Sequence, residues 1–168
     1  MMRKSNGNGN DSIQSWLKAH TYKNNIYHLS KDRNFTYDPY LYDKQYKISP
    51  DDLSNGKGLL NIVKTRNIDL TYPAWEIGCG TGSLSLGFAK LHNFPNYLIS
   101  DMSSEFLYIT KQKLDTMCIN SDRYTLAVYD ADAEYTPPPE QSFSLITLRA
   151  TLHHILHPEN FIKKCLLY

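Results

Sequence analysis

The sequence has few cysteines and no excess of charge of either sign. Cys79, Cys118 and Cys165 are far apart and form no CxxC pair. Neither a disulfide framework nor a zinc cluster is therefore expected, and the three thiols are predicted to be buried as small apolar groups. A reducing, cytoplasmic compartment is the expected location of the protein. The 18 Lys and Arg nearly balance the 17 Asp and Glu, for a formal net charge of +1. This balance argues against nucleic acid or an anionic membrane as a partner.

Long apolar runs are also lacking. No stretch approaches the roughly 20 residues that a membrane-spanning helix needs. The first residues, MMRKSNGNGNDS, carry no apolar segment of the kind that a secretory signal requires, so residues 1–12 are predicted to be a disordered tail. The 168 residues suffice for one domain with a hydrophobic core.

Tyrosine is abundant, and six of the 13 tyrosines lie between Tyr22 and Tyr46. We favour a loop packed over the core for this segment, and a cap over a ligand pocket is the alternative. Helical turns are expected within residues 13–29, and a helix is expected from Ser49-Pro50 to about residue 67. Residues 13–70 are therefore predicted to form an N-terminal helical cap segment.

From residue 72 onward the pattern alternates between strands and helices. Strands are predicted at residues 73–77, 97–101, 124–129 and 143–148, and the last helix begins at Pro158. This alternation indicates an α/β fold with parallel strands, right-handed crossovers and helices on both faces. Ligands bind such sheets beyond the carboxyl ends of the strands.

Three alternating glycines follow the first of these strands. Gly78, Gly80 and Gly82 give GxGxG, whereas a dinucleotide-binding loop reads GxGxxG and would have its third glycine at Ser83. Because the turn precedes a helix, free N–H groups are expected to face a pocket. Glu76 adds a negative charge just before the turn. The pattern therefore favours a positively charged nucleoside over a pyrophosphate.

Three segments resemble the class I S-adenosylmethionine-dependent methyltransferases. WEIGCGTGSLSLGFAK resembles their motif I, LISDMSSEF their second-strand motif, and DAEYTPPPEQSFSLITLRATLHHILHPENF their later motifs, in the expected order. The similarity spans residues 74–167. It implies a Rossmann-like domain over residues 71–168, strand order 3-2-1-4, and S-adenosyl-L-methionine as the cofactor.

The resemblance also implies contacts for the nucleoside. Asp101 would accept hydrogen bonds from the ribose diol, and Met102 would pack on the adenine. Asp132 would accept from the adenine amino group, and the Ala133 N–H would meet a ring nitrogen. Asp130 begins the same Asp-Ala dipeptide two residues earlier, although the spacing to the later motifs favours Asp132. The predicted cofactor-binding residues are Glu76, Gly78, Cys79, Gly80, Gly82, Asp101, Met102, Asp132, Ala133, Leu148 and Arg149.

Histidines follow the fourth predicted strand, near Leu148 and Arg149, which would border the methionine moiety. His153 and His154 are candidate general bases, and the alternative is that they only cap or pack. A metal site formed with His157 is not expected, because adjacent side chains point apart and no carboxylate has ligand spacing.

One departure concerns the sheet. The family's sheet continues into three more strands, whereas this sequence stops at Tyr168, which would leave the fourth strand as an open apolar edge. We expect either a truncated chain or an edge covered by a second copy, a partner chain or the N-terminal segment.

The favoured function is methyl transfer to a small molecule. The alternative is a catalytically incomplete scaffold that binds the cofactor or a partner. A dinucleotide-dependent oxidoreductase is disfavoured by the GxGxG spacing.

Overall fold

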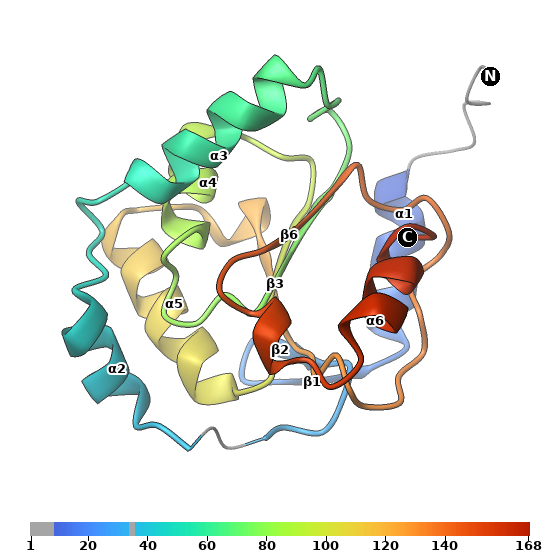
Figure 1. Cartoon of the computed structure of the whole chain (residues 1–168), viewed down its shortest axis with the longest axis horizontal. Helices are drawn as coiled ribbons and strands as arrows, with labels where there is room; N and C mark the ends of the chain where they lie inside the picture. Colours follow the sequence, from blue (N-terminus) through green and yellow to red (C-terminus); the bar gives the residue numbers. More distant parts are fainter. Residues whose placement is uncertain (1–8, 34–35) are drawn as a thin grey trace.

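A six-stranded mixed sheet with helices on both faces forms the protein (Figure 1). The computed structural model describes residues 9–33 and 36–168. The strands are β1 (Thr21–Lys23), β2 (Ile26–His28), β3 (Ala74–Ile77), β4 (Tyr97–Asp101), β5 (Thr125–Val128) and β6 (Leu145–Leu148). The α-helices are α1 (Gly9–Lys18), α2 (Pro39–Tyr46), α3 (Ser54–Thr65), α4 (Ser85–Leu91), α5 (Ser104–Thr116) and α6 (Pro158–Cys165). Two short 3₁₀ helices are η1 (Ser121–Arg123) and η2 (Leu152–His154).

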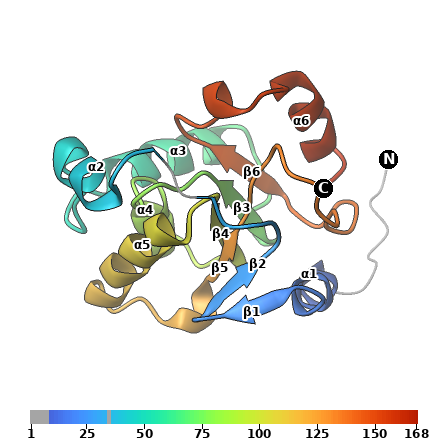
Figure 2. The same cartoon turned by 90° about the horizontal axis from the view of Figure 1, so that it is seen from below.

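The four predicted parallel strands are adjacent in the sheet and have the predicted order. The order along the sheet is β1-β2-β5-β4-β3-β6, so β5-β4-β3-β6 reproduces 3-2-1-4 (Figure 2). Ile77 pairs with Ser100 on one side and with Leu148 on the other. The carboxyl ends of these strands are therefore level with one another, which brings the residues that follow them together.

An N-terminal hairpin extends this sheet, and it corrects the helical expectation for residues 13–29. Helix α1 ends at Lys18, and β1 and β2 then pair antiparallel across Asn24 and Asn25, whose φ angles are 53° and 63°. Strand β2 runs parallel to β5. The hairpin thus lies at the edge opposite β6, and none of the described N-terminal residues pairs with β6. Within the described ranges, β6 pairs with β3 alone.

The predicted tail lies mostly outside the described residues. Its last four positions, 9–12, belong to the first turn of α1 rather than to a tail. None of the helices in residues 9–33 and 36–168 has the length and apolar character needed to cross a membrane.

Two apolar cores hold the layers together. Helices α3, α4 and α5 cover one face of the sheet, and α1 and α6 cover the other (Figures 1 and 2). Strand β3 serves both cores, since Ala74 packs with the first group and Trp75 with the second. Of the thiols expected to be buried, Cys79 is buried but Cys118 is exposed, because it occupies the left-handed position just past α5.

Helix α2 replaces the loop that was favoured for the Tyr-rich segment. Asp38 caps it by accepting from the backbone N–H groups of Tyr40 and Leu41, and Pro39 occupies the first turn. Helix α2 lies beside α5 (Figure 1). Residues 36–53, which comprise α2 and its connection to α3, are called the cap below.

Candidate functional site

A cavity of about 1120 Å³ opens at the carboxyl ends of the parallel strands. Asp101 ends β4 there, and Gly78, Asp130 and Arg149 follow β3, β5 and β6, while the cap forms the facing wall. This is the position at which open α/β sheets bind ligands. Of the predicted site residues, the cavity wall includes Glu76, Gly78, Cys79, Gly80, Asp101, Met102, Asp132, Arg149, His153 and His154.

The glycine-rich turn needs its glycines for two different reasons. All three have positive φ, at 73°, 55° and 96° for Gly78, Gly80 and Gly82. A Cβ at Gly78 would lie 2.3 Å from the Thr151 hydroxyl oxygen, so this position permits close packing against the segment after β6. A Cβ at Gly80 would meet nothing closer than Tyr42, at 3.8 Å. Gly80 is therefore the position where bare backbone faces the cavity.

Most N–H groups of this turn are already used inside the protein, which corrects the expectation that they face the pocket. The N–H groups of Gly78 and Cys79 both donate to the Ser100 carbonyl, at 2.8 and 2.9 Å. The Gly80 N–H donates to the Asp101 carboxylate at 2.9 Å. The end of β4 accepts these hydrogen bonds because it lies beside the turn at the same level of the sheet. An anionic phosphate would therefore find few free donors here.

Asp101 joins the turn to helix α5. One carboxylate oxygen accepts from Gly80 N–H, and the other accepts from Ser103 N–H at 3.1 Å. Burial raises the pKa of Asp101 to about 6, although these backbone hydrogen bonds act in the opposite direction. Each carboxylate oxygen can accept more than one hydrogen bond, so Asp101 keeps acceptor capacity toward the cavity that it lines.

Glu76 is more deeply enclosed than its predicted role suggested. The residue is 1% exposed. The same oxygen, Oε2, accepts from the Ser85 hydroxyl at 2.8 Å and from the Tyr97 hydroxyl. Burial raises the pKa of Glu76 to about 7 against the effect of both hydrogen bonds. The group thus braces the start of α4, and it offers the cavity only part of a negative charge at neutral pH.

The two Asp-Ala dipeptides after β5 have different surroundings. Asp130 is buried, and its oxygens accept from the Arg33 guanidinium at 2.8 Å and from Asp132 N–H at 3.0 Å. Asp132 is exposed, and one of its oxygens accepts from Leu156 N–H. The Ala133 N–H donates to the Asp130 carbonyl at 3.1 Å, and Ala133 lines a smaller neighbouring cavity. This environment leaves Asp132 the more available acceptor.

The residues after β6 form the remaining wall. Arg149, His153 and His154 are exposed and line the cavity, whereas Leu148 and Gly82 do not. The two imidazole rings lie 3.9 Å apart between centroids. The expectation that these adjacent side chains point apart is therefore wrong. Within residues 9–33 and 36–168, no group of three or more His, Cys, Asp or Glu is placed to hold a metal ion.

The cap contributes residues that the sequence analysis did not single out. Tyr37, Tyr42 and Tyr46 line the cavity. Tyr42 packs edge-on against Phe106 of α5, with ring centroids 5.3 Å apart. The alternative of a cap over a pocket agrees with this arrangement, whereas the favoured loop over the core does not. Asp38-Pro39 is a helix-start signal that could have predicted α2, but the sequence analysis did not use it. Arg33, Thr151 and Lys113 had no comparable local signal.

Comparisons with known proteins agree with this geometry. The sequence profile of the family described as "Methyltransferase domain" matches residues 75–167. A comparison with curated protein sequences finds no match.

Solved structures share the fold at low sequence identity. A candidate S-adenosyl-L-methionine-dependent methyltransferase from Methanococcus maripaludis is 18% identical with a TM-score of 0.64, and the match covers 82% of this chain and 62% of that one. A SAM-dependent methyltransferase from Aquifex aeolicus is 15% identical with a TM-score of 0.60, covering 79% and 67%. The [4+2]-cyclase SpnF is 16% identical with a TM-score of 0.51, covering 94% and 53%.

The matches thus span about two thirds of the first two neighbours and about half of the third. The family match covers more than half of this chain and includes the glycine-rich turn and the four strand ends that surround the cavity. The chain belongs to the methyltransferase domain family, and it shares its fold with two proteins described as S-adenosylmethionine-dependent methyltransferases.

Proposed function

We propose that this protein transfers a methyl group from S-adenosylmethionine to a small-molecule acceptor. The observation that carries the proposal is the meeting of a bare glycine, Gly80, with the buried carboxylate of Asp101 in one cavity under the cap. Small-molecule sites typically enclose roughly 300–1,000 Å³. The volume of about 1120 Å³ is therefore large enough for a nucleoside cofactor together with a small acceptor.

The residues around the cavity fit this cofactor. Gly80 leaves space where a side chain would intrude on a ligand, and Asp101 has acceptor capacity for a ribose diol. Met102 lines the same side and suits an adenine face, and exposed Asp132 suits its amino group. Because the N–H groups of the turn are already engaged, a cationic nucleoside is better matched than a diphosphate.

Methyl transfer asks little covalent chemistry of the protein. The bound cofactor supplies an electrophilic methyl group on a sulfonium. The chain must hold the donor and the acceptor in line and keep water out, and the tyrosines of the cap are suited to that exclusion. His153 and His154 lie at the cavity wall, where either could take a proton from an oxygen or carbon acceptor.

Calorimetry with S-adenosylhomocysteine tests the proposal directly. We expect micromolar binding to the wild-type chain, loss of binding in Asp101→Ala, and no response to NAD. Asp122→Ala is the matched control, because Asp122 is exposed in η1 and does not line the cavity. Strong binding of NAD, or equal affinity in Asp101→Ala and wild type, would reject the assignment of the site.

The second candidate is a scaffold that binds the cofactor or a partner without methyl transfer. A cyclase among the structural neighbours shows that this fold serves more than one reaction, so the fold alone does not fix the chemistry. Screening a panel of small oxygen, nitrogen and carbon acceptors with methyl-labelled cofactor distinguishes the two. Binding of S-adenosylhomocysteine without turnover of any acceptor would favour the scaffold.

A further inference from the structure

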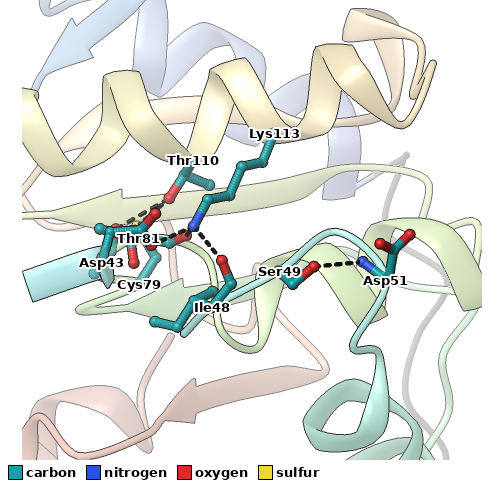
Figure 3. Close-up of polar contacts among 9 residues, drawn as sticks. Asp43, Ile48, Ser49, Asp51, Cys79, Thr81, Thr110 and Lys113 are labelled. Atoms are coloured by element: carbon teal, nitrogen blue, oxygen red, sulfur yellow. Dashed lines mark hydrogen bonds and ion pairs between the residues drawn. The ribbon is translucent and has the colours of Figure 1, made fainter. Parts of the chain in front are cut away.

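Helix α5 holds the glycine-rich turn by two successive carbonyl groups. The Thr110 hydroxyl donates to the Gly80 carbonyl at 3.0 Å, and the Lys113 ammonium donates to the Thr81 carbonyl at 3.1 Å (Figure 3). Residues 110 and 113 lie on one face of the helix because they are three positions apart. The turn is thereby fixed from the side of α5.

Lys113 also reaches the cap. Its ammonium forms an ion pair with the Asp43 carboxylate of α2 and donates to the Ile48 carbonyl at 2.9 Å (Figure 3). An ammonium group has three N–H donors, and here two of its acceptors, the Asp43 carboxylate and the Ile48 carbonyl, belong to the cap, while the third, the Thr81 carbonyl, belongs to the turn. The Lys113 side chain is 12% exposed and Asp43 is 24% exposed, so solvent screens these contacts only partly.

A second lysine on the same helix provides a contrast. Lys111 pairs with Asp115 one turn later on α5, and among the described residues it forms no hydrogen bond or ion pair with the cap or the turn. Half of the Asp115 side chain is exposed. Such surface pairs contribute little to stability. The two lysines therefore share a helix and a charge but differ in what they connect.

We propose that Lys113 is a positioning residue that couples the cap to the glycine-rich turn. The inference rests on the proposed function for its consequence, since the coupled elements are the two walls of the cofactor cavity. Lys113 fixes the carbonyl next to Gly80 and the end of α2 through a single ammonium group. Losing that group releases the cap from the turn and widens the cavity without touching the ligand-facing side chains.

Two variants test this coupling against a matched control. Lys113→Met keeps the apolar stem and removes all three hydrogen bonds, whereas Asp43→Ala removes only the ion pair. Lys111→Met is the control. The first measurement is trypsin cleavage after Lys44 and Lys47, at the end of α2, without any ligand. We expect about tenfold faster cleavage in Lys113→Met, a smaller increase in Asp43→Ala, and no change in Lys111→Met.

The second measurement is the affinity for S-adenosylhomocysteine. We expect about tenfold weaker binding in Lys113→Met, a smaller loss in Asp43→Ala and no change in Lys111→Met. Cleavage and affinity that match wild type in Lys113→Met overturn the proposal. Equal losses in Lys111→Met also overturn it, because they would show a general effect on α5. Failure of the wild-type chain to bind the nucleoside rejects the positioning role together with the proposed function, while the cleavage rates still decide whether Lys113 holds the cap.

Discussion

Replacing Glu76 by glutamine is expected to stabilise the fold at alkaline pH. Both hydrogen bonds to the carboxyl group, from Ser85 and Tyr97, end on the single oxygen Oε2. A glutamine carbonyl can take that place and keep both donors satisfied. The substitution therefore removes a buried charge without removing the hydrogen-bond acceptor. Because no buried donor is left unsatisfied, such a replacement costs little stability.

The magnitude follows from the pKa of Glu76. Folding raises it from the ordinary value of 4.5 to about 7. In the wild type, Glu76 therefore ionises at a lower pH in the unfolded chain than in the folded one. The folded state thus loses stability relative to the unfolded state as pH rises from 4.5 to 7. This shift in the pKa corresponds to a loss of about 3 kcal/mol in the free energy of unfolding. Glutamine does not titrate, so the stability difference between Glu76→Gln and wild type should grow by about this amount over the same range.

Denaturant unfolding from pH 4.5 to pH 8.5 measures this difference. Trp75 is fully buried and Trp16 is 7% exposed, so their fluorescence reports loss of the core. Asp101, whose pKa is also raised, to about 6, titrates in both proteins, so the comparison removes its contribution except for its charge interaction with Glu76. Stability curves that stay parallel across this range would refute the reasoning, because they would show that Glu76 ionises normally in the folded chain.

Two pairs of glycine substitutions provide the remaining predictions. Gly78→Ala should cost more stability than Gly80→Ala, since both have positive φ, worth about 1–2 kcal/mol, but only Gly78 abuts Thr151; denaturation midpoints compare them, and equal losses would contradict the packing argument. Gly56→Ala should destabilise by about 1–3 kcal/mol, because its Cβ would lie 2.5 Å from the backbone of α4. Gly58→Ala on the same helix has open space around it and should stabilise by up to about 1 kcal/mol; thermal melts that rank the two variants in the opposite order would refute this.

The parallel core of the fold could be predicted because its signals are local. Each predicted strand is a short apolar run followed by a turn or a helix, and the crossover rule then limits the order. The N-terminal hairpin was missed although Asn24-Asn25 between Tyr22 and Ile26 fits a two-residue turn with positive φ. The helical prediction for residues 13–29 included the hairpin because apolar periodicity alone does not distinguish short strands from helical turns.

The candidate site divides in the same way. Asp101, Gly80 and Asp132 were identified by position, and each lines the cavity. Sequence reasoning did not find Arg33 or Lys113. Their partners, Asp130 and Asp43, lie 97 and 70 positions away along the chain. Charged partners that distant cannot be paired from sequence spacing, because only the folded chain brings them within reach.

The end of β4 fixes the shape of the glycine-rich turn and, if the proposed function holds, also determines which ligands the turn suits. Ser100 and Asp101 accept hydrogen bonds from three N–H groups of the glycine-rich turn. A turn with free donors would attract phosphate oxygens, whereas one whose donors end on a carboxylate presents negative charge instead. The same Asp101 that fixes the Gly80 backbone also lines the cavity in which we propose that the cofactor binds. Specificity for a cationic nucleoside and rigidity of the turn are thus expected to be lost together when Asp101 is changed, and no substitution there should separate them.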